Sequence, residues 1–412
     1  DAERRLHRNI PLGVVALDRA SVSFLFTDRV AYVTFPMGGA FPGEPRSLRR
    51  EGHATVARPT RAKWQELELV CEIGVGVAAI APQVCRLLRE LAGADAAALF
   101  WMDDRGLPEG FFHEDSTHEA QDLFLNEFER LFLGPAELNV ATLVRLDGPG
   151  WGRLLVPPTS YWRSNTFNLL VRASGHHHAL DLRIEHHGRA RAVALLFRVE
   201  GHPFEEVDLA TLRRAAPALS RAFERATTDD TWELAGKGTG SPSRGGSLIV
   251  DAVGERLLFA GEGARSLLQA SNLVGQGIPA DGPLRAPPAF ARRLCAELAA
   301  EGNVREIIPV AQGRLVVTAE PLAEPGTGAG VVSLAVTLEV PRRLRLVESL
   351  MALDLSPRRR SLLLAAASGE TRTAAAARTR TSPEAMKKHL AAIYDATGLR
   401  SWAELARFSE RI

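Results

Sequence analysis

Apolar residues recur at helical spacing between Trp64 and Gly93, and a glycine at the end of such a run is typical of a helix C-terminus. The segment 94–106 predicts a strand that runs into an Asp-Asp-Arg-Gly turn, so its two aspartates indicate a turn rather than a paired-carboxylate site. The segment 119–132 has the apolar spacing of an amphipathic helix. This part of the chain therefore mixes helices with strands.

The segment 180–189 has the strand period of two, because three aliphatic residues alternate with three charged ones. The aliphatic residues are Leu180, Leu182 and Ile184, and the charged residues are Asp181, Arg183 and Glu185. This alternation predicts a strand with one buried and one solvated face. The next residues, His-His-Gly-Arg at 186–189, favour a hairpin turn. The segment 204–226 then predicts a long amphipathic helix with acidic residues in its first turn.

The order of these elements resembles a GAF domain over about 64–226, most specifically over 180–223. The resemblance implies an antiparallel sheet flanked by helices, with a ligand pocket on one face of the sheet. Three aromatic residues that stand close together in the sequence, Tyr161, Trp162 and Phe167, are candidates for lining that pocket. Ordinary core packing is the alternative for them.

Two further segments connect or precede folded parts. Residues 1–63 contain two short strand-like runs and a stretch rich in Pro, Gly and Arg, and they define no fold. Residues 227–246 are small, polar and rich in glycine, which predicts a linker.

The segment 247–340 has strand, turn, strand and helix patterns followed by later strands, and its opening resembles a PAS domain. Leu267 and Leu268 correspond to the paired leucines at the end of the short PAS helix. After it, 341–354 has apolar residues at helical spacing, which predicts a stiff amphipathic helix that connects the body to the C-terminus. These residues are Leu344, Val347, Leu350 and Met351.

Four short helices are predicted in 355–412 by their capping residues. The expected starts are Ser356, Thr371 or Thr373, Ser382 and Ser401, and the expected stops include Gly369 and Gly398. The third helix carries Lys387, Lys388 and His389 in a row, with Met386, Leu390, Ile393 and Tyr394 placed to pack as core. A helix with packed apolar positions and a small, cationic outer face suits the major groove of DNA, and a solvated basic helix is the alternative.

This C-terminal segment resembles the LuxR-type helix-turn-helix in the order and spacing of its residues over about fifty positions. The matching positions are Leu355, Ser356, Pro357, Arg358, Gly369, Ala376, Ser382, Lys387, His389, Leu390, Ile393, Gly398, Arg400, Ser401, Ala403, Glu404 and Leu405. The resemblance implies a homodimer that pairs through the fourth helix, with Leu405 and Phe408 partly exposed in the monomer. We expect DNA contacts from Arg358, Arg372, Ser382, Glu384, Ala385, Lys387, Lys388 and His389. The chain departs from the family pattern at several positions, among them Ala375, Ala385 and Trp402.

Charge supports a nucleic-acid partner at this end of the chain. The whole sequence has 50 Lys and Arg against 49 Asp and Glu, but 355–412 has 11 Lys and Arg against 5 Asp and Glu. A basic end on a slightly acidic body is typical of a nucleic-acid-binding segment attached to a sensor.

The remaining composition limits the class of protein. Three cysteines far apart form neither a disulfide framework nor a metal-binding spacing, and the start lacks the apolar core of a secretory signal. The cysteine usage favours a reducing cytoplasm, and with no apolar run of about 18 residues we expect no membrane span. No nucleophile elbow, phosphate-binding glycine loop or HExxH motif occurs, so we expect no enzyme.

Histidines concentrate at 176–187 and raise the question of a cofactor. His176, His178 and His186 share a strand face by phase, and imidazole binds both metals and haem. Their spacing matches no standard metal motif, so we expect no cofactor and read them as strand-end and turn residues.

Together these patterns predict an α+β protein with GAF-like and PAS-like sensor domains of antiparallel sheet, followed by an all-α four-helix domain. The predicted function is a bacterial transcription regulator that binds double-stranded DNA as a homodimer under control of a small-molecule signal. RNA polymerase is a further expected partner. The alternative is a sensor or scaffold whose C-terminal helices bind a protein and not DNA, which the departures at Ala375, Ala385 and Trp402 keep open.

Overall fold

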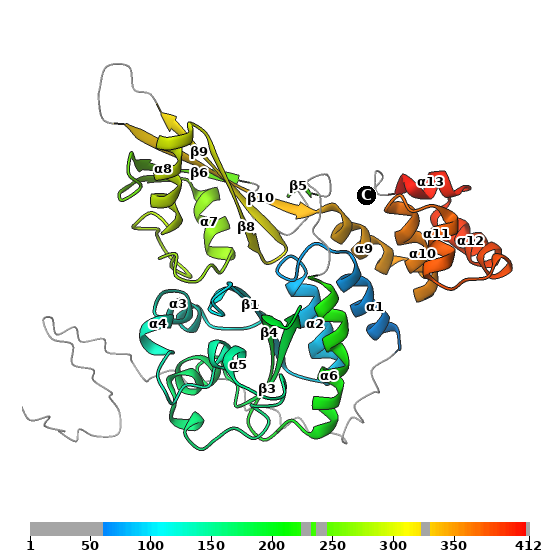
Figure 1. Ribbon diagram of the computed structural model, residues 1–412, viewed down its shortest axis with the longest axis horizontal. Coiled ribbons are helices and arrows are strands. Elements are labelled where there is room, and N and C mark those ends of the chain that lie inside the picture. Colours follow the sequence, from blue (N-terminus) through cyan, green and yellow to red (C-terminus); the bar gives the residue numbers. More distant parts are fainter. Residues whose placement is uncertain (1–60, 224–231, 236–244, 323–329, 409–412) are drawn as a thin grey trace, which may run out of the picture. The chain divides into compact units, whose positions relative to one another are not determined.

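The computed structural model describes residues 61–223, 232–235, 245–322 and 330–408 (Figure 1). Nearly all of the uncertain segment 1–63 and most of the predicted linker 227–246 lie outside these ranges. The described chain contains two antiparallel sheets and a series of helices, so its fold class is α+β. We refer to 61–223 as the first sheet region, 232–341 as the second sheet region, and 357–408 as the C-terminal helices.

The first sheet region has four strands in the order β2-β1-β4-β3, all antiparallel. The strands are β1 (Ala96–Met102), β2 (Pro108–His113), β3 (His178–His186) and β4 (Arg189–Arg198). The helices before and after them are α1 (Arg61–Glu72), α2 (Ala81–Ala92) and α6 (Glu206–Arg221). Between β2 and β3 come α3 (His118–Asn126), α4 (Phe128–Leu131), α5 (Val140–Arg145), η1 (Tyr161–Arg163) and the π-helical η2 (Thr166–Val171).

Both faces of this sheet are covered, because helices pack on each side of it (Figure 1). On one side, α2 and α6 contact β1 and β3 and bury the aliphatic residues of the strands. On the other side lie the short helices α3, α4 and α5, which bury the aromatic residues of the same strands. We call these the aliphatic face and the aromatic face. Residues that are neighbours along a strand belong to opposite faces, as the strand period requires.

The prediction of a solvated face on β3 is wrong at Asp181, which is 2% exposed. Leu180, Leu182 and Ile184 are buried as expected; on the opposite side Asp181 is covered, Arg183 is half-buried, and Glu185 is exposed as predicted. The charge of Asp181 in an alternating pattern predicted a solvent-exposed side chain, but in the structure a second layer packs over this position. The hairpin prediction at 186–189 is confirmed: His187 and Gly188 both have positive φ, at 51° and 71°, and His186 pairs with Arg189.

Two predicted helices are each divided in the structure. The segment that ends at Gly93 forms α1 and α2, and Gly74 and Gly76 stand between them with φ of 67° and 86°. These φ values are incompatible with a continuous right-handed helix. The second predicted helix, over 119–132, is interrupted at Glu127 between α3 and α4. Gly93 closes α2 in the left-handed conformation, as predicted.

The second sheet region has the strand order β7-β6-β10-β9-β8, and β5 pairs with β10. Its strands are β5 (Trp232–Leu234), β6 (Gly245–Asp251), β7 (Leu257–Ala260), β8 (Val304–Val310), β9 (Gly313–Leu322) and β10 (Val331–Pro341). Two helices, α7 (Glu262–Ala270) and α8 (Phe290–Glu301), belong to this region, and Leu267 and Leu268 are buried in its core. β5 and the start of β6 fall within the segment predicted as a linker, so the linker prediction does not hold there.

The C-terminal part consists of α9 (Arg342–Ala352) followed by α10 (Pro357–Ala367), α11 (Arg372–Arg378), α12 (Pro383–Thr397) and α13 (Trp402–Ala406). α10 contacts each of the three later helices, which makes it the centre of this small bundle. The Thr371, Ser382 and Ser401 side chains accept hydrogen bonds from the backbone N–H groups of Ala374, Ala385 and Glu404, so three of the predicted caps are present. Ser356 has the N-cap backbone conformation without a side-chain bond.

Candidate ligand cavity and nucleic-acid interface

A cavity lies in the first sheet region, on the aromatic face of the sheet. Its volume is about 60 Å³. Strand residues Phe100, Phe111 and Phe197 form its floor, and Phe124 of α3 and Val140 of α5 lie among the residues that cover it. The rings of Phe100, Phe111 and Phe124 pack with centroids 5.0–5.4 Å apart, a separation typical of favourable aromatic pairs. The cavity is therefore bounded by rigid apolar rings.

The polar side chains that line the cavity differ in their hydrogen bonding. Asn139 donates to the Phe132 carbonyl oxygen and accepts from the Ala141 backbone N–H. Thr166 bonds to the Glu137 carboxylate at 2.5 Å through its hydroxyl. The Tyr161 hydroxyl, by contrast, is buried and has no hydrogen-bond partner among the described protein atoms, in a residue that is 2% exposed. Burying a hydroxyl without a hydrogen-bond partner costs free energy. A ligand that forms a hydrogen bond with Tyr161 would recover part of that cost.

The buried Asp181 side chain holds the cavity wall that contains Leu154. Its carboxylate accepts a 2.6 Å hydrogen bond from the backbone N–H of Leu154, a residue that lines the cavity. Burial raises the pKa of Asp181 to about 6, although the hydrogen bond from Leu154 acts in the opposite direction. The carboxyl is thus a buried anchor for the 150–156 loop that carries Leu154.

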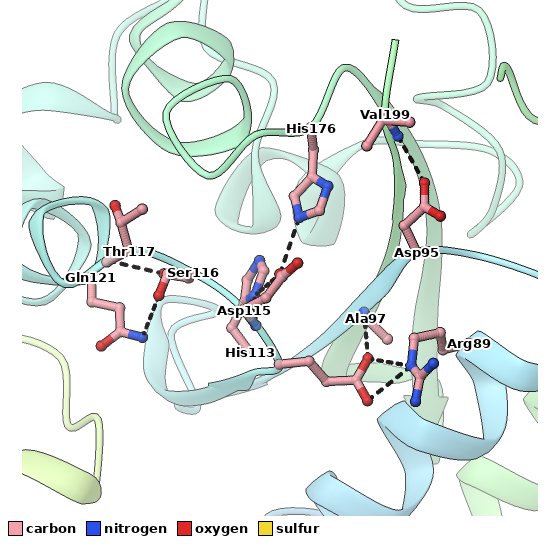
Figure 2. A network of polar contacts seen from close by, with 11 residues as sticks. Arg89, Asp95, Ala97, His113, Asp115, Ser116, Thr117, Gln121, His176 and Val199 are labelled. Atoms are coloured by element: carbon pink, nitrogen blue, oxygen red, sulfur yellow. Dashed lines mark hydrogen bonds and ion pairs between the residues drawn. The ribbon is translucent and has the colours of Figure 1, made fainter. Parts of the chain in front are cut away.

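A histidine–aspartate network stands at the end of β2 (Figure 2), and one member, His113, lines the cavity. His176 Nε2 lies 3.0 Å from Asp115 Oδ1, and His113 Nδ1 lies 3.4 Å from the same oxygen. Both imidazoles stack on Phe197, with ring centroids 5.0 and 5.2 Å away. Burial acts to raise the pKa of Asp115, but the hydrogen bonds from the two histidines outweigh it and leave that pKa below its ordinary value. The network links β2 to the segment before β3.

A second, outer cavity of about 300 Å³ lies next to the first. Trp162 and His177 stack at its edge, with ring centroids 5.0 Å apart and planes 24° apart. Burial, with the neighbouring His177, lowers the pKa of His178, which also lines this cavity. Its walls thus combine apolar surface with two imidazoles.

The structure separates the three aromatic residues proposed from the sequence as pocket residues. Tyr161 lines both cavities, and Trp162 lines the outer one only. Phe167 lines neither; it is buried and packs against Tyr161 and Trp162 with centroids 5.4 and 4.8 Å away. Sequence reasoning missed Phe100, Phe111 and Phe197 as lining residues. They stand on three different strands, β1, β2 and β4, so the usable signal was the period-two phase within each strand, which sets the face of its aromatic residue.

The histidine cluster does not form a metal site among the residues that the structure describes, where no group of three or more His, Cys, Asp and Glu could hold a metal ion. His176 is buried beside Asp115, whereas His186 lies at the hairpin next to His187. The shared strand face predicted for His176, His178 and His186 therefore does not bring them together as ligands. Across the described ranges, no helix has the length and apolarity to span a bilayer.

The C-terminal helices present a cationic surface on α12. Lys387 and Lys388 are exposed, while Met386, Leu390 and Ile393 of the same helix are buried. Small residues flank the lysines, among them Ala385 and Ala391, and these let a partner approach the helix backbone closely. Lys387 lies 3.4 Å from Glu384, in an exposed pair that contributes little to stability.

The other residues expected to contact DNA divide into exposed and half-buried ones. Exposed residues are Arg358, Arg372, Ser382 and Glu384, and half-buried residues are Ala385 and His389. Burial lowers the pKa of His389, and the nearby charges of Arg359 and Arg358 lower it further. Both causes favour the uncharged imidazole, so the cationic surface of α12 rests on the two lysines.

The expected exposure of Leu405 is wrong, because this residue is fully buried within the C-terminal helices. α10 contacts α13, so the leucine that was expected to face a second protomer instead completes the core of its own bundle. Phe408 is half-buried and packs against the same core. Trp402, a departure from the family pattern, donates a 3.0 Å hydrogen bond from its indole N–H to the Glu370 carbonyl oxygen and so joins α13 to the end of α10.

Comparison with known proteins gives no family. No family model matches the chain, and no curated protein matches it. Among solved structures, a phage VqmA–DPO complex has 17% identity over 42% of this chain and 84% of that one, with a TM-score of 0.19. The sensor region of a sensor histidine kinase has 14% identity over 66% and 89%, with a TM-score of 0.16.

A third structure, the E. coli DhaR(N)–DhaL complex, has 14% identity over 69% of this chain and 90% of that one, with a TM-score of 0.16. TM-scores in this range do not establish a common fold, so no property of this chain is taken from these proteins.

Proposed function

We propose that this chain is a transcription regulator in which the C-terminal helices bind double-stranded DNA and the sheet regions sense a signal. The observation that carries the proposal is α12, where Lys387 and Lys388 are exposed above a buried row of Met386, Leu390 and Ile393. A helix held in this way can enter the major groove without losing its core contacts.

The cap at Ser382 supports this role, because the Ser382 hydroxyl bonds to the backbone N–H of Ala385 and fixes where α12 begins. In helix-turn-helix proteins, the first residues of the recognition helix contact base edges, and nearby cations position the protein on phosphates. Arg358 and Arg372 are exposed and available for phosphate contacts. The sequence resemblance to the LuxR-type domain assigns the same helix to DNA.

The body supports a sensing role through its cavity. The sequence resemblances to GAF and PAS domains imply sensor folds for 64–226 and 247–340, and a cavity with an unpartnered buried hydroxyl lies in the first of them. A signal can act on DNA binding only if it binds one conformation of the protein better than another. We propose a small molecule as that signal.

The test of DNA binding begins with selection of duplexes from a random pool by the full chain, followed by titration on the selected duplex. Replacing both Lys387 and Lys388 with Ala should abolish specific binding, since each base or phosphate contact contributes about 1–3 kcal/mol. The slope of log affinity against log salt should also become shallower, by about one unit for each lost phosphate contact.

The matched control removes two exposed cations from the first sheet region, with Arg145→Ala and Arg189→Ala together. It changes the net charge by the same amount and should leave affinity and salt slope close to those of the unaltered chain. Specific binding that survives in the double-lysine variant would remove α12 as the recognition helix. If no duplex is enriched at all, the DNA-binding proposal fails, and the scaffold alternative, in which these helices bind a protein, is the one that remains.

A homodimer on DNA remains part of the proposal, but Leu405 cannot mediate it while it fills the core of its own bundle. Phe408, half-buried at the end of α13, is the residue left from the expected pair. Sedimentation of the chain alone and on the selected duplex tests this: one copy per duplex would exclude the dimer.

A further inference from the structure

Two cavities in the first sheet region share one wall. The inner cavity and the outer cavity have three lining residues in common, Leu154, Tyr161 and Ala179. All three are buried, at 5%, 2% and 4% exposed, and Tyr161 has the largest side chain among them. Displacement of the Tyr161 ring would therefore open the widest passage between the two spaces.

The inner cavity is small. A single water needs about 10–15 Å³, so about 60 Å³ holds on the order of four to six waters, whereas a cavity that binds benzene measures roughly 150 Å³. A six-membered ring therefore fits here when the Tyr161 ring yields part of the neighbouring space. The outer cavity is about five times larger by the same measure, at about 300 Å³ against about 60 Å³. The inner cavity therefore sets the size limit for a ligand that both fills it and touches Tyr161.

The chemistry of the inner walls disfavours a charged ligand. Phe100, Phe111 and Phe124 supply flat apolar surface, and His113, the lining imidazole, already lies 3.4 Å from the Asp115 carboxylate, so an ion buried here would lose its hydration with little compensation. The Asn139 and Thr166 side chains already bond within the protein. The Tyr161 hydroxyl is the buried lining group with donor and acceptor capacity left over.

We propose that the inner cavity binds an uncharged single-ring compound that carries one hydroxyl or similar hydrogen-bonding group, and that Tyr161 both pairs with this group and forms the movable partition to the outer cavity. The ring of the ligand stacks or packs edge-on against the phenylalanines, which favour such geometries. The outer cavity, with the Trp162–His177 stack at its edge, is the entrance. This inference names the signal class of the sensing function proposed above and rests on that function for its biological meaning only.

The first experiment measures binding of p-cresol and toluene to the full chain by calorimetry. The two probes have the same ring and methyl group and differ by one hydroxyl. We expect p-cresol to bind about three- to tenfold more tightly than toluene, the range for one neutral hydrogen bond. In Tyr161→Phe this preference should disappear, because the variant loses the hydroxyl and keeps the ring. Tyr394→Phe, the same change in α12, is the matched control and should keep the preference.

The second experiment tests the partition with a larger probe, 2-naphthol. The unaltered chain should bind 2-naphthol at least tenfold more weakly than p-cresol, because two fused rings exceed the inner cavity. Tyr161→Leu removes the ring that separates the cavities, so it should bind 2-naphthol more tightly than the unaltered chain does and lose its preference for p-cresol over toluene. Circular dichroism of each variant establishes that it is folded before binding is measured.

Three results would overturn the proposal: no heat from either small probe, an unchanged preference in Tyr161→Phe, or equal 2-naphthol affinity in Tyr161→Leu and the unaltered chain. None of these measurements contains DNA. A failure here, with intact DNA selection by α12, would reject the ligand class and leave the DNA-binding proposal standing. Intact binding with failed DNA selection would do the reverse.

Discussion

The two faces of the first sheet are built from neighbouring residues of the same strands, yet they differ in what covers them, and the aromatic face encloses a cavity of about 60 Å³. On the aliphatic face, Leu182 and Leu196 are fully buried against the long helices α2 and α6. On the aromatic face, Phe100 and Phe197 lie under the short helices and turns between β2 and β3.

The shapes of the side chains explain the difference. Leucine and isoleucine interdigitate with the regular ridges of a long helix and leave few voids. Phenylalanine rings are flat and rigid, and short helices that change direction at Glu127 and Phe132 cannot follow them everywhere. A sheet can therefore carry a stabilising face and a binding face at once, separated only by the alternation of residues along each strand.

The largest expected effect compares Leu196→Ala with Leu195→Ala, the same change at adjacent residues of β4. Leu196 belongs to the packed aliphatic face, and its truncation should cost about 4 kcal/mol of unfolding free energy. Leu195 borders the existing cavity, so fewer contacts are lost and the cost should lie near 2 kcal/mol. Hydrogen exchange of peptides across β3 and β4 in the full chain measures both. Equal costs would mean that the two faces are equally well packed.

A smaller effect concerns Asp181, the buried carboxyl behind the cavity wall. Burial raises the pKa of Asp181 to about 6 from an ordinary 3.8, so between these values the folded state holds a proton that the unfolded state has lost. The free energy of unfolding therefore falls as pH rises from about 4 to 6. Asp181→Asn keeps an acceptor for the Leu154 N–H and never ionises, so it should flatten this slope and stabilise the region at pH 7 by on the order of 2 kcal/mol.

Urea unfolding at several pH values between 4 and 7, followed by exchange of the β3 peptide, measures the slope. The control is Asp104→Asn, which changes an exposed carboxyl of the same region and should leave the slope in place. A slope in Asp181→Asn that parallels that of the unaltered chain would show that this carboxyl is not its source.

Local sequence patterns predicted the ends and turns of elements correctly where one or two residues determine the backbone conformation. The hairpin at His187–Gly188, the end of α2 at Gly93 and the caps at Ser382 and Ser401 all follow from conformations or bonds that one or two residues specify. The aliphatic residues of β3 were likewise placed correctly, because their period matches the strand.

The cavity could be predicted only in part, because it depends on which segments cover a face. Tyr161 was proposed as a pocket residue from its aromatic neighbours, but Phe167 in the same stretch lies in the core outside both cavities. The predictions for Asp181 and Leu405 failed for the same reason: a charge in an alternating strand suggested solvent, and the LuxR-type resemblance implied that Leu405 faces a second protomer. In both cases, packing from residues distant in sequence decided the burial.

The smallest effect is a test of sign, in which one added methylene should act oppositely on the two sides of the sheet. Val140→Ile extends a side chain of α5 that lines the cavity, so it should fill part of the space and raise the unfolding free energy by about 0.8 kcal/mol. Val84→Ile makes the same change on α2, where the residue is fully buried in the aliphatic core, and overpacking should lower the unfolding free energy by about 1 kcal/mol. Hydrogen exchange across β1 and β4 in the full chain measures the unfolding free energy of both variants.

Val140→Ile should also weaken p-cresol binding, because the added methylene takes space from the ligand ring, whereas Val84→Ile should not. If both variants destabilise equally, the aromatic face has no usable space, and the cavity would not admit a ligand without larger rearrangement.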